Sequence, residues 1–263
     1  MLKTDAPTRS TAAAWERLEA ETGAGAGARC SIGLLALSTD RIGELDTRAF
    51  LEGFDGVELF ATRVPMSAVA TPQSLAAMES HLEAAAGLLV PGSKLDVIGF
   101  SCTSGTAAIG AAKVAEAIRR ARPGIAVTTP VEAGAEGLRA LGSRRISLLA
   151  PYRPATADLV SGYFEEQGFA IDRKATFDLD GDPDMNRVTP EALIAAGRRI
   201  LHPDSDALFI SCTGLRTAPV VAALEKAIGR PVVTSSQALA WHALRLGNVP
   251  DRVTGRGRLF EAL

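Results

Sequence analysis

Apolar residues form two alternating patterns along the chain from Cys30 onward. Short apolar runs predict buried strands over 30–37, 56–61, 95–101, 125–128, 145–150, 169–176, 206–211 and 231–235. Longer amphipathic segments between them predict helices over 73–89, 107–121, 131–141, 155–167, 190–202, 218–228 and 237–246. Strands that alternate with helices of about 10–15 residues form βαβ units, which build parallel sheets. The predicted fold class is therefore α/β.

The residues before the first strand, 1–28, are predicted to form an N-terminal extension. Good helix formers over 11–22 predict a short helix, and the alternating Gly and Ala of 23–28 predict a flexible spacer. These glycines resemble a dinucleotide-binding fingerprint, but they precede the first strand. Phosphate binding requires the glycines between a strand and the following helix, so we reject a nucleotide site here.

An internal repeat is the most informative feature of the pattern. Segment 96–103 (DVIGFSCT) matches segment 206–213 (DALFISCT) in register, and 32–36 (IGLLA) is similar to 146–150 (ISLLA). The distance along the chain between the two copies is nearly the same for both matches and differs by only a few residues. The two matches therefore describe one duplication with a small deletion. We expect two similar α/β domains related by a pseudo-twofold axis, with the last helix returning to the first. The expected first domain is 29–129 plus 232–263, and the second is 130–231.

Cys102 and Cys212 follow equivalent strands, at the carboxyl end where parallel α/β sheets bind ligands. Each is followed by hydroxyl and small residues, whose backbone N–H groups suit an anion. The field of a helix N-terminus also favours a thiolate, so we expect it to lower the pKa of both thiols. The turn residues are candidate substrate ligands: Thr103, Ser104, Thr213 and Gly214.

Two thiols on opposite sides of a bound molecule suit a proton-transfer reaction at carbon. One thiolate removes a proton from carbon or adds to it, and the other thiol delivers a proton on the opposite side. A carboxylate held by the turn N–H groups takes up the negative charge that develops. This chemistry requires no metal, flavin or pyridoxal. We therefore expect no cofactor, and a small carboxylate substrate as the binding partner.

Simpler interpretations of these cysteines stay open. A single cysteine at a strand end is most often a small buried hydrophobic residue, and Cys30, which opens a strand, is expected in the core. Two copies in equivalent positions favour a functional role for Cys102 and Cys212. A non-catalytic binding protein remains an alternative, because two-lobed α/β proteins also close around small molecules. Decarboxylation or carbon–nitrogen chemistry in the same cleft is another.

A few other polar residues are weaker candidates for substrate contact. Tyr152 follows a strand end of the second half, where its hydroxyl group is able to donate to a carboxylate; a loop residue without function is the alternative. Ser38, Thr39 and Asp40 occupy the equivalent loop of the first half, where turn chemistry competes with binding. Asn186 precedes a predicted helix start, so capping competes there.

The composition excludes several classes of protein. Lys+Arg 28 against Asp+Glu 30 gives the 263-residue chain a formal net charge of −2, so no basic surface is expected to attract nucleic acid or a membrane. No apolar run approaches the roughly 20 residues of a membrane-spanning helix, and the N-terminal residues lack a secretory apolar segment. The three cysteines form no CxxC pair and the three histidines no HExxH motif, which argues against a zinc site. We expect a cytoplasmic protein, with homo-oligomerisation left open.

Four segments together resemble one known family. Segments 99–105 (GFSCTSG) and 211–217 (SCTGLRT) are similar to the paired cysteine motifs of the aspartate/glutamate racemase superfamily. Segments 150–152 (APY) and 235–241 (SSQALAW) resemble the Thr-Pro-Tyr turn and the closing Ser-Asn-Gln-Ala-x-x-Trp motif of its maleate cis-trans isomerase and arylmalonate decarboxylase branch. Within that branch, 36–40 and 91–99 are most similar to the ectoine-utilisation A proteins.

The resemblance implies two α/β domains, each with a four-stranded parallel sheet, and a site at their interface. It implies that Cys102 acts as nucleophile or base and Cys212 as acid. Tyr152 corresponds to the family's tyrosine, and Asn186 to its second-half asparagine. The implied function is a cofactor-independent isomerase or racemase that acts at a carbon next to a carboxylate.

One loop departs from the family's pattern. Maleate isomerases usually carry Pro-Ser-Ser-Asn after the first strand, and its asparagine holds a substrate carboxylate, whereas residues 37–40 read LSTD. An ionised Asp40 would repel a dicarboxylate, which favours a substrate with an amine or amide at that end, such as a diamino acid from ectoine breakdown. Arylmalonate decarboxylases keep only the second-half cysteine, so Cys102 favours isomerisation or racemisation over decarboxylation.

Overall fold

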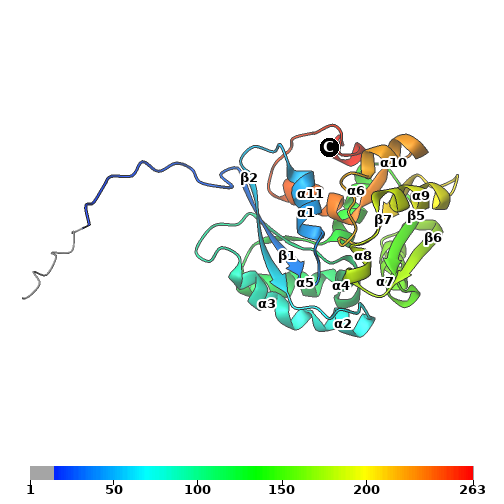
Figure 1. Cartoon of the computed structure of the whole chain (residues 1–263), viewed down its shortest axis with the longest axis horizontal. Helices are drawn as coiled ribbons and strands as arrows, with labels where there is room; N and C mark the ends of the chain where they lie inside the picture. The colour runs from blue at the N-terminus through cyan, green and yellow to red at the C-terminus, as the bar shows by residue number, and fades with distance from the viewer. Residues whose placement is uncertain (1–14, 263) are drawn as a thin grey trace, which may run out of the picture.

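Two four-stranded parallel sheets form the body of the protein in the computed structural model, which describes residues 15–262 (Figure 1). The first sheet, in the order β2-β1-β3-β4, contains β1 (Cys30–Leu37), β2 (Val57–Val64), β3 (Val97–Phe100) and β4 (Ala126–Thr128). The second, in the order β6-β5-β7-β8, contains β5 (Arg145–Tyr152), β6 (Ala170–Leu179), β7 (Ala207–Ile210) and β8 (Val232–Thr234). Every strand pair is parallel. The predicted α/β fold is confirmed, and both sheets follow the same chain order.

Helices connect the strands and cover the sheets. The helices between strands of the first sheet are α1 (Gly43–Leu51), α2 (Pro72–Ala77), α3 (Glu79–Leu88), α4 (Thr103–Ile109) and α5 (Ala111–Ala121). Those that follow β4 are α6 (Pro130–Ala140), α7 (Pro154–Glu166), α8 (Asp182–Met185), α9 (Pro190–Ile200), α10 (Val221–Ile228) and α11 (Ser235–Leu246), with a 3₁₀ helix at Arg258–Phe260. None of the helices between residues 15 and 262 is long and apolar enough to cross a membrane.

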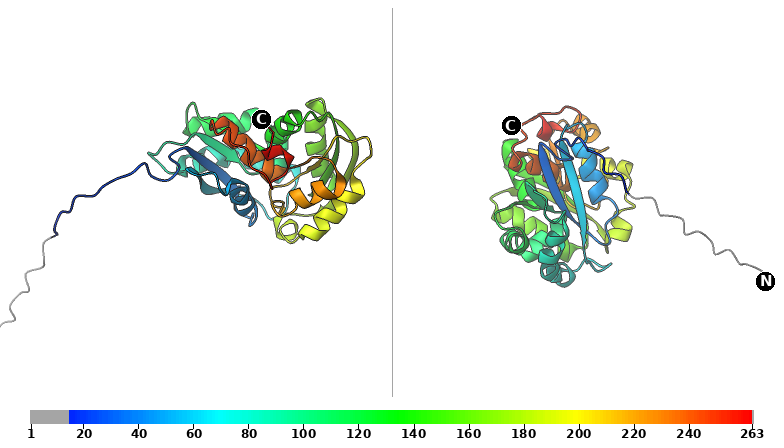
Figure 2. Two further views of the ribbon diagram at one scale, coloured as in Figure 1. Left: turned by 90° about the horizontal axis from the view of Figure 1, so that it is seen from above. Right: turned by 90° about the vertical axis from the view of Figure 1, so that its left-hand side faces the viewer.

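The helix that follows the last strand of each sheet packs on the other half. α6 follows β4, yet a Cβ on its Gly134 would lie 2.7 Å from Cε2 of Phe209 in β7. α11 follows β8, yet it packs against β3 and β4 (Figure 2). A Cβ on Gly99 in β3 would lie 3.3 Å from Cδ1 of Leu239 in α11. One hydrophobic core contains residues of β1, β5 and β7, so the two halves interlock.

The domain boundaries of the sequence analysis stay a prediction, and one of them needs adjustment. β8 hydrogen-bonds to β7 of the second sheet. A boundary drawn before residue 232 would therefore separate this strand from its own sheet. The crossing of α11 to the first half places the natural division after Thr234, which is the N-cap residue of α11.

Local structure differs from the sequence pattern in several places, among them segment 73–89, which forms the two helices α2 and α3. The helix predicted over 11–22 is wrong for residues 15–22, which form no helix, while 11–14 lie outside the described residues. Trp15 and Leu18 are 99% and 81% exposed, so no packing stabilises a helix this short. The helix predicted over 107–121 is two helices, because Gly110 has φ 97° and separates α4 from α5. The pattern missed α1, whose start is bound by the Asp40 carboxylate.

Candidate active site

The two repeated cysteines lie just beyond the carboxyl ends of β3 and β7 and line one small cavity. The cavity has a volume of about 20 Å³, roughly the room that one water molecule needs. Both halves contribute to its wall: Leu37, Met66, Ala70, Leu75, Cys102, Thr103, Ser104, Tyr152, Asp182, Met185, Cys212 and Thr213. The two thiols therefore face the same enclosed space.

Cys102 is the N-cap residue of α4, and its sulfur is held by the first turn of that helix. Its Sγ accepts a hydrogen bond from the Gly105 N–H at 3.2 Å and lies 3.9 Å from Ser104 Oγ. A Cβ at position 105 would lie 2.8 Å from this sulfur and 2.5 Å from Cε of Met78. The close approach of the thiol to the helix therefore depends on glycine at position 105.

Cys212 occupies a backbone conformation that non-glycine residues rarely adopt. Its φ is 94°, a strain of order 1–3 kcal/mol of the kind that concentrates at functional sites. Its Sγ accepts a hydrogen bond from the Gly214 N–H at 3.3 Å, and its own N–H donates to Ser235 Oγ at 3.0 Å. The strained turn is a sign of function that is independent of the sequence repeat.

Burial raises the pKa of both thiols. The pKa of Cys102 rises to about 12, because the loss of water outweighs the hydrogen bonds from Gly105 and Ser104. The pKa of Cys212 also lies well above its usual value through burial, and the negative charge of Asp182 raises it further. The expected lowering of these pKa values is therefore wrong for the closed cavity. At Cys102, desolvation outweighs the field of the α4 N-terminus. Cys212 has no helix directly after it, because the next one, α10, begins at Val221.

Hydroxyl groups connect the two cysteine loops across the halves. Thr103 Oγ1 donates to Ser235 Oγ at 2.8 Å, and Ser235 Oγ also accepts from the Cys212 N–H. Thr213 Oγ1 donates to the carbonyl oxygen of Ser101 at 2.9 Å. Both threonines line the cavity, but their hydroxyl groups already donate hydrogen bonds to other groups of the protein. Sequence reasoning did not identify Ser235, whose position between the loops depends on the crossing of α11.

Tyr152 ends β5 and presents its hydroxyl group at the cavity. Its oxygen accepts a hydrogen bond from Ser211 Oγ at 3.2 Å, and burial raises its pKa well above the usual value. The hydroxyl group therefore keeps its proton at neutral pH and is able to donate it to a bound anion. Ser104 brings a second hydroxyl group to the wall.

Two aspartates lie near the site in different roles. Asp40 is not part of the cavity wall; its carboxylate accepts hydrogen bonds from the Ile42 and Gly43 N–H groups, at 2.8 and 3.0 Å, and burial raises its pKa to about 6. Asp182, at the start of α8, does line the cavity and accepts a hydrogen bond from Thr39 Oγ1. The acidic group expected at Asp40 is thus supplied at Asp182, which the sequence analysis did not single out.

The remaining candidates lie beside the cavity. Ser38 Oγ accepts from the Met66 N–H at 3.0 Å and supports the loop after β2. The carboxamide of Asn186 is buried, and both of its polar atoms lack a hydrogen-bond partner among the described residues. A Cβ on Gly214 would lie 3.3 Å from Asn186 Oδ1 and 3.4 Å from Cys212 Sγ. Glycine at position 214 therefore leaves room for the thiol and the amide to lie side by side.

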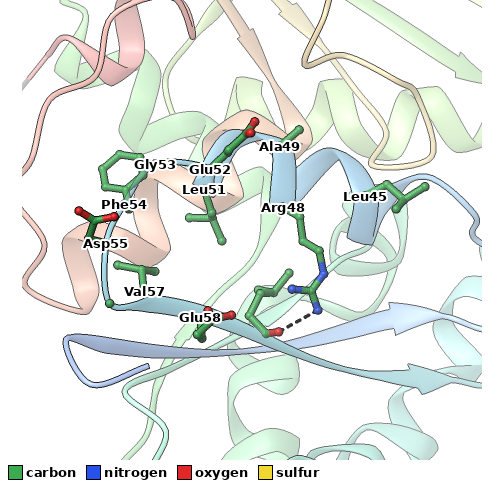
Figure 3. Close-up of a pocket in the computed structure, with 12 residues that line it drawn as sticks. Leu45, Arg48, Ala49, Leu51, Glu52, Gly53, Phe54, Asp55, Val57 and Glu58 are labelled. Carbon is green, nitrogen blue, oxygen red and sulfur yellow. Dashed lines mark hydrogen bonds between the residues drawn. The ribbon is translucent and has the colours of Figure 1, made fainter. Parts of the chain in front are cut away.

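A larger hollow lies away from the cysteines, between α1 and β2 (Figure 3). Its volume is about 590 Å³, and its wall includes Leu45, Arg48, Phe54 and Glu58. The Arg48 guanidinium group is already bonded there, to the Leu59 carbonyl oxygen at 2.8 Å and to Glu44. The residues that line this groove include the carboxylates of Glu52, Asp55 and Glu58 but no cysteine, serine, threonine or histidine. The small cavity with the two thiols is therefore the candidate active site.

Known proteins match most of this chain. A family model described as arylmalonate decarboxylase matches residues 55–260. The maleate isomerase of Nocardia farcinica is 30% identical over 240 residues, which cover 88% of this chain and 95% of that protein. The arylmalonate decarboxylase of Bordetella bronchiseptica is 34% identical over 145 residues, which cover 54% of this chain and 60% of that protein.

A solved structure extends the comparison to the fold. A cysteine-to-serine variant of the Nocardia farcinica maleate cis-trans isomerase, with a covalently bound succinylcysteine intermediate, matches with a TM-score of 0.80 at 27% sequence identity. The match covers 88% of this chain and 98% of that chain.

Proposed function

Since the chain belongs to the family of the arylmalonate decarboxylases and maleate isomerases, we propose that it is a cofactor-independent isomerase of a small carboxylate. The observation that carries this proposal is the cavity that Cys102 and Cys212 line together, each from its own half. The covalent succinylcysteine in the Nocardia farcinica relative supports a covalent role for one of the two thiols.

The proposed reaction uses one thiolate, at Cys102, and one thiol, at Cys212. The Cys102 sulfur forms a bond to one alkene carbon, and the π electron pair moves to the neighbouring carbon and its carboxylate group. The Cys212 thiol protonates that carbon and becomes a thiolate, and the new single bond rotates. Return of the proton to Cys212 and cleavage of the S–C bond release the trans product. In a racemisation, one sulfur would remove a proton from carbon while the other delivers one on the opposite face.

The carboxylate of the substrate is proposed to bind the hydroxyl groups of Tyr152 and Ser104, which both line the cavity. Negative charge moves onto that carboxylate when the thiolate adds, so donors that are already in place stabilise the transition state. A cavity of about 20 Å³ holds no four-carbon acid, so the two halves have to separate before substrate binds. Water then reaches the thiols, and their pKa values fall toward the ordinary range.

The test is an NMR screen in heavy water for isomerisation and for exchange of carbon-bound protons. Maleate, amino acids and diamino acids derived from ectoine are incubated with the wild type and with the Cys102→Ser and Cys212→Ser variants. The diamino acids are included because of the resemblance of segments 36–40 and 91–99 to the ectoine-utilisation A proteins. We expect turnover by the wild type and its loss in both variants. Turnover of wild-type rate in both variants would refute the proposal.

A non-catalytic binding protein is the second candidate, because burial raises the pKa of both thiols. A binding protein also has to open for its ligand, so iodoacetamide labelling and turnover are measured together. A site that opens transiently should label with a rate that rises with pH from about 8, as opening hydrates a thiol of ordinary pKa. Labelling with no turnover of any probe in the NMR screen would favour the binding protein, and labelling with turnover the isomerase.

Decarboxylation is the third candidate, since the matching family model is that of arylmalonate decarboxylase. It would release carbon dioxide, and the product would be lighter than the substrate. Mass spectrometry of the products of the NMR screen therefore decides between isomerisation and decarboxylation.

A further inference from the structure

The cavity wall carries a single kind of charge. Among the described residues that line it, Asp182 is the only Asp or Glu and none is Lys, Arg or His. Burial raises the pKa of the Asp182 carboxyl group, and a bound cation would favour its ionised form. A dicarboxylate would bring two negative charges to this space with no cation to receive them. Asp40 lies near Asp182 and adds to the negative potential of the cavity, since Asp182 and Asp40 each raise the pKa of Cys212.

The position of Asp182 leaves one of its oxygens facing the reactive loop. Oδ2 accepts a hydrogen bond from Thr39 Oγ1, which fixes the carboxylate across the two halves. Oδ1 lies 3.3 Å from the point that a Cβ of Gly214 would occupy, beside Cys212 Sγ at 3.4 Å from the same point. Within the described residues, Oδ1 forms no hydrogen bond. Oδ1 is therefore able to accept a hydrogen bond from a ligand, at the loop that carries Cys212.

Hydroxyl donors lie elsewhere on the wall. Ser104 belongs to the Cys102 loop of the first half, with its Oγ 3.9 Å from Cys102 Sγ, whereas Asp182 lies at the Cys212 loop of the second half. The Tyr152 hydroxyl group is a second donor. The wall thus offers hydroxyl donors for one carboxylate and a single carboxylate acceptor. A substrate complementary to this wall carries an anion and, at a separate position, a hydrogen-bond donor.

We propose that Asp182 is the specificity-determining residue of this site, and that it selects a substrate with one carboxylate and, at its other end, a protonated amine. The inference rests on the proposed function, because it assumes that the cavity between the two cysteines receives the substrate. It assigns to Asp182 Oδ1 a charge-assisted hydrogen bond from the ammonium group, which a second carboxylate would be unable to donate.

Binding is tested with two saturated probes of equal chain length, 4-aminobutanoate and succinate, by isothermal titration calorimetry. Asp182→Asn removes the charge with little change in shape. Asp184→Asn is the matched control, because Asp184 lies on the same short helix but is exposed and outside the cavity. We expect the wild type and Asp184→Asn to bind 4-aminobutanoate at least tenfold more tightly than succinate, and Asp182→Asn to lose that preference. Equal or tighter binding of succinate by the wild type, no binding of 4-aminobutanoate, or an unchanged preference in Asp182→Asn would each overturn the proposal.

Turnover distinguishes this inference from the proposed function. The unsaturated probes are cis-4-aminobut-2-enoate and maleate, with conversion to the trans isomers followed by NMR. We expect the wild type to prefer the amine, and Asp182→Asn to shift the ratio of kcat/KM toward maleate by at least tenfold. Conversion of neither probe, together with amine binding that depends on Asp182, would reject the isomerase and leave the selectivity standing. Conversion of maleate at equal rates by both proteins would reject the selectivity and leave the isomerase standing.

Discussion

Ser235 links the two cysteine loops, and its replacement by alanine tests whether that link matters. Ser235 Oγ accepts from the Cys212 N–H at 3.0 Å and from Thr103 Oγ1 at 2.8 Å. All three residues are buried, with exposed fractions of 0%, 5% and 1% for Ser235, Cys212 and Thr103. Each buried donor that loses its acceptor costs about 1–3 kcal/mol. We therefore expect Ser235→Ala to lower the free energy of unfolding by about 2–4 kcal/mol.

The same change should reduce activity more than substrate affinity. A thiol displaced by about 1 Å loses on the order of 100-fold in rate, so kcat is expected to fall by about that factor while KM changes little. Urea denaturation gives the stability, and the NMR assay gives the kinetic constants. Thr47→Val is the control, because the Thr47 hydroxyl group is also buried but has no partner within the described residues. The link would be unimportant if Ser235→Ala matched this control in both stability and kcat.

Three further changes test separate parts of the site. Asp46→Asn should lower stability by about 1.5–3 kcal/mol in urea denaturation, because this buried side chain accepts hydrogen bonds from the Thr217 N–H and hydroxyl groups beyond the second cysteine; a loss below about 0.5 kcal/mol would contradict this. Gly105→Ala should displace the Cys102 thiol and abolish turnover in the NMR assay, since the new Cβ would lie 2.8 Å from Sγ; full activity would refute that contact. The pKa of Asp40 is raised to about 6, so the folded state holds its proton more strongly than the unfolded state. The contribution of this group to the free energy of unfolding is present below about pH 4 and falls by about 3 kcal/mol as the pH rises through 6. Asp40→Asn should remove that decline in denaturation curves measured from pH 4 to 7. An unchanged decline in the variant would exclude Asp40 as its source.

The sequence predicted the parts of the fold whose signal is local. β1, β3 and β7 are buried along their whole length, so their apolar runs identify them without reference to the rest of the chain. The repeat around Cys102 and Cys212 identified both cysteines, because duplication places equivalent residues at equivalent strand ends. The α/β class followed from the alternation of these runs with amphipathic helices.

The site depends on packing that no local pattern records. Asp182 reaches the cavity only because α8 follows β6 at the edge where the two halves meet. The position of Asp40 outside the cavity wall was not predictable, because its carboxylate binds the start of α1, a helix that the apolar pattern missed. The thiol pKa values depend on how completely the halves exclude water, and this closure is a property of the assembled fold.

The most direct test of the two-thiol account is mass spectrometry of the Cys212→Ser variant after incubation with the alkene that the wild type isomerises. Without the Cys212 thiol, the sulfur of Cys102 should still add to the alkene, with water that enters the open site supplying the proton to the neighbouring carbon more slowly. The adduct should accumulate, because its reversal needs the Cys212 thiolate to remove that proton. We predict a covalent adduct on the peptide that contains Cys102, and none in the double variant that also carries Cys102→Ser. An unmodified Cys102 in a Cys212→Ser protein that binds the alkene, or an adduct on Cys30 alone, would contradict the account.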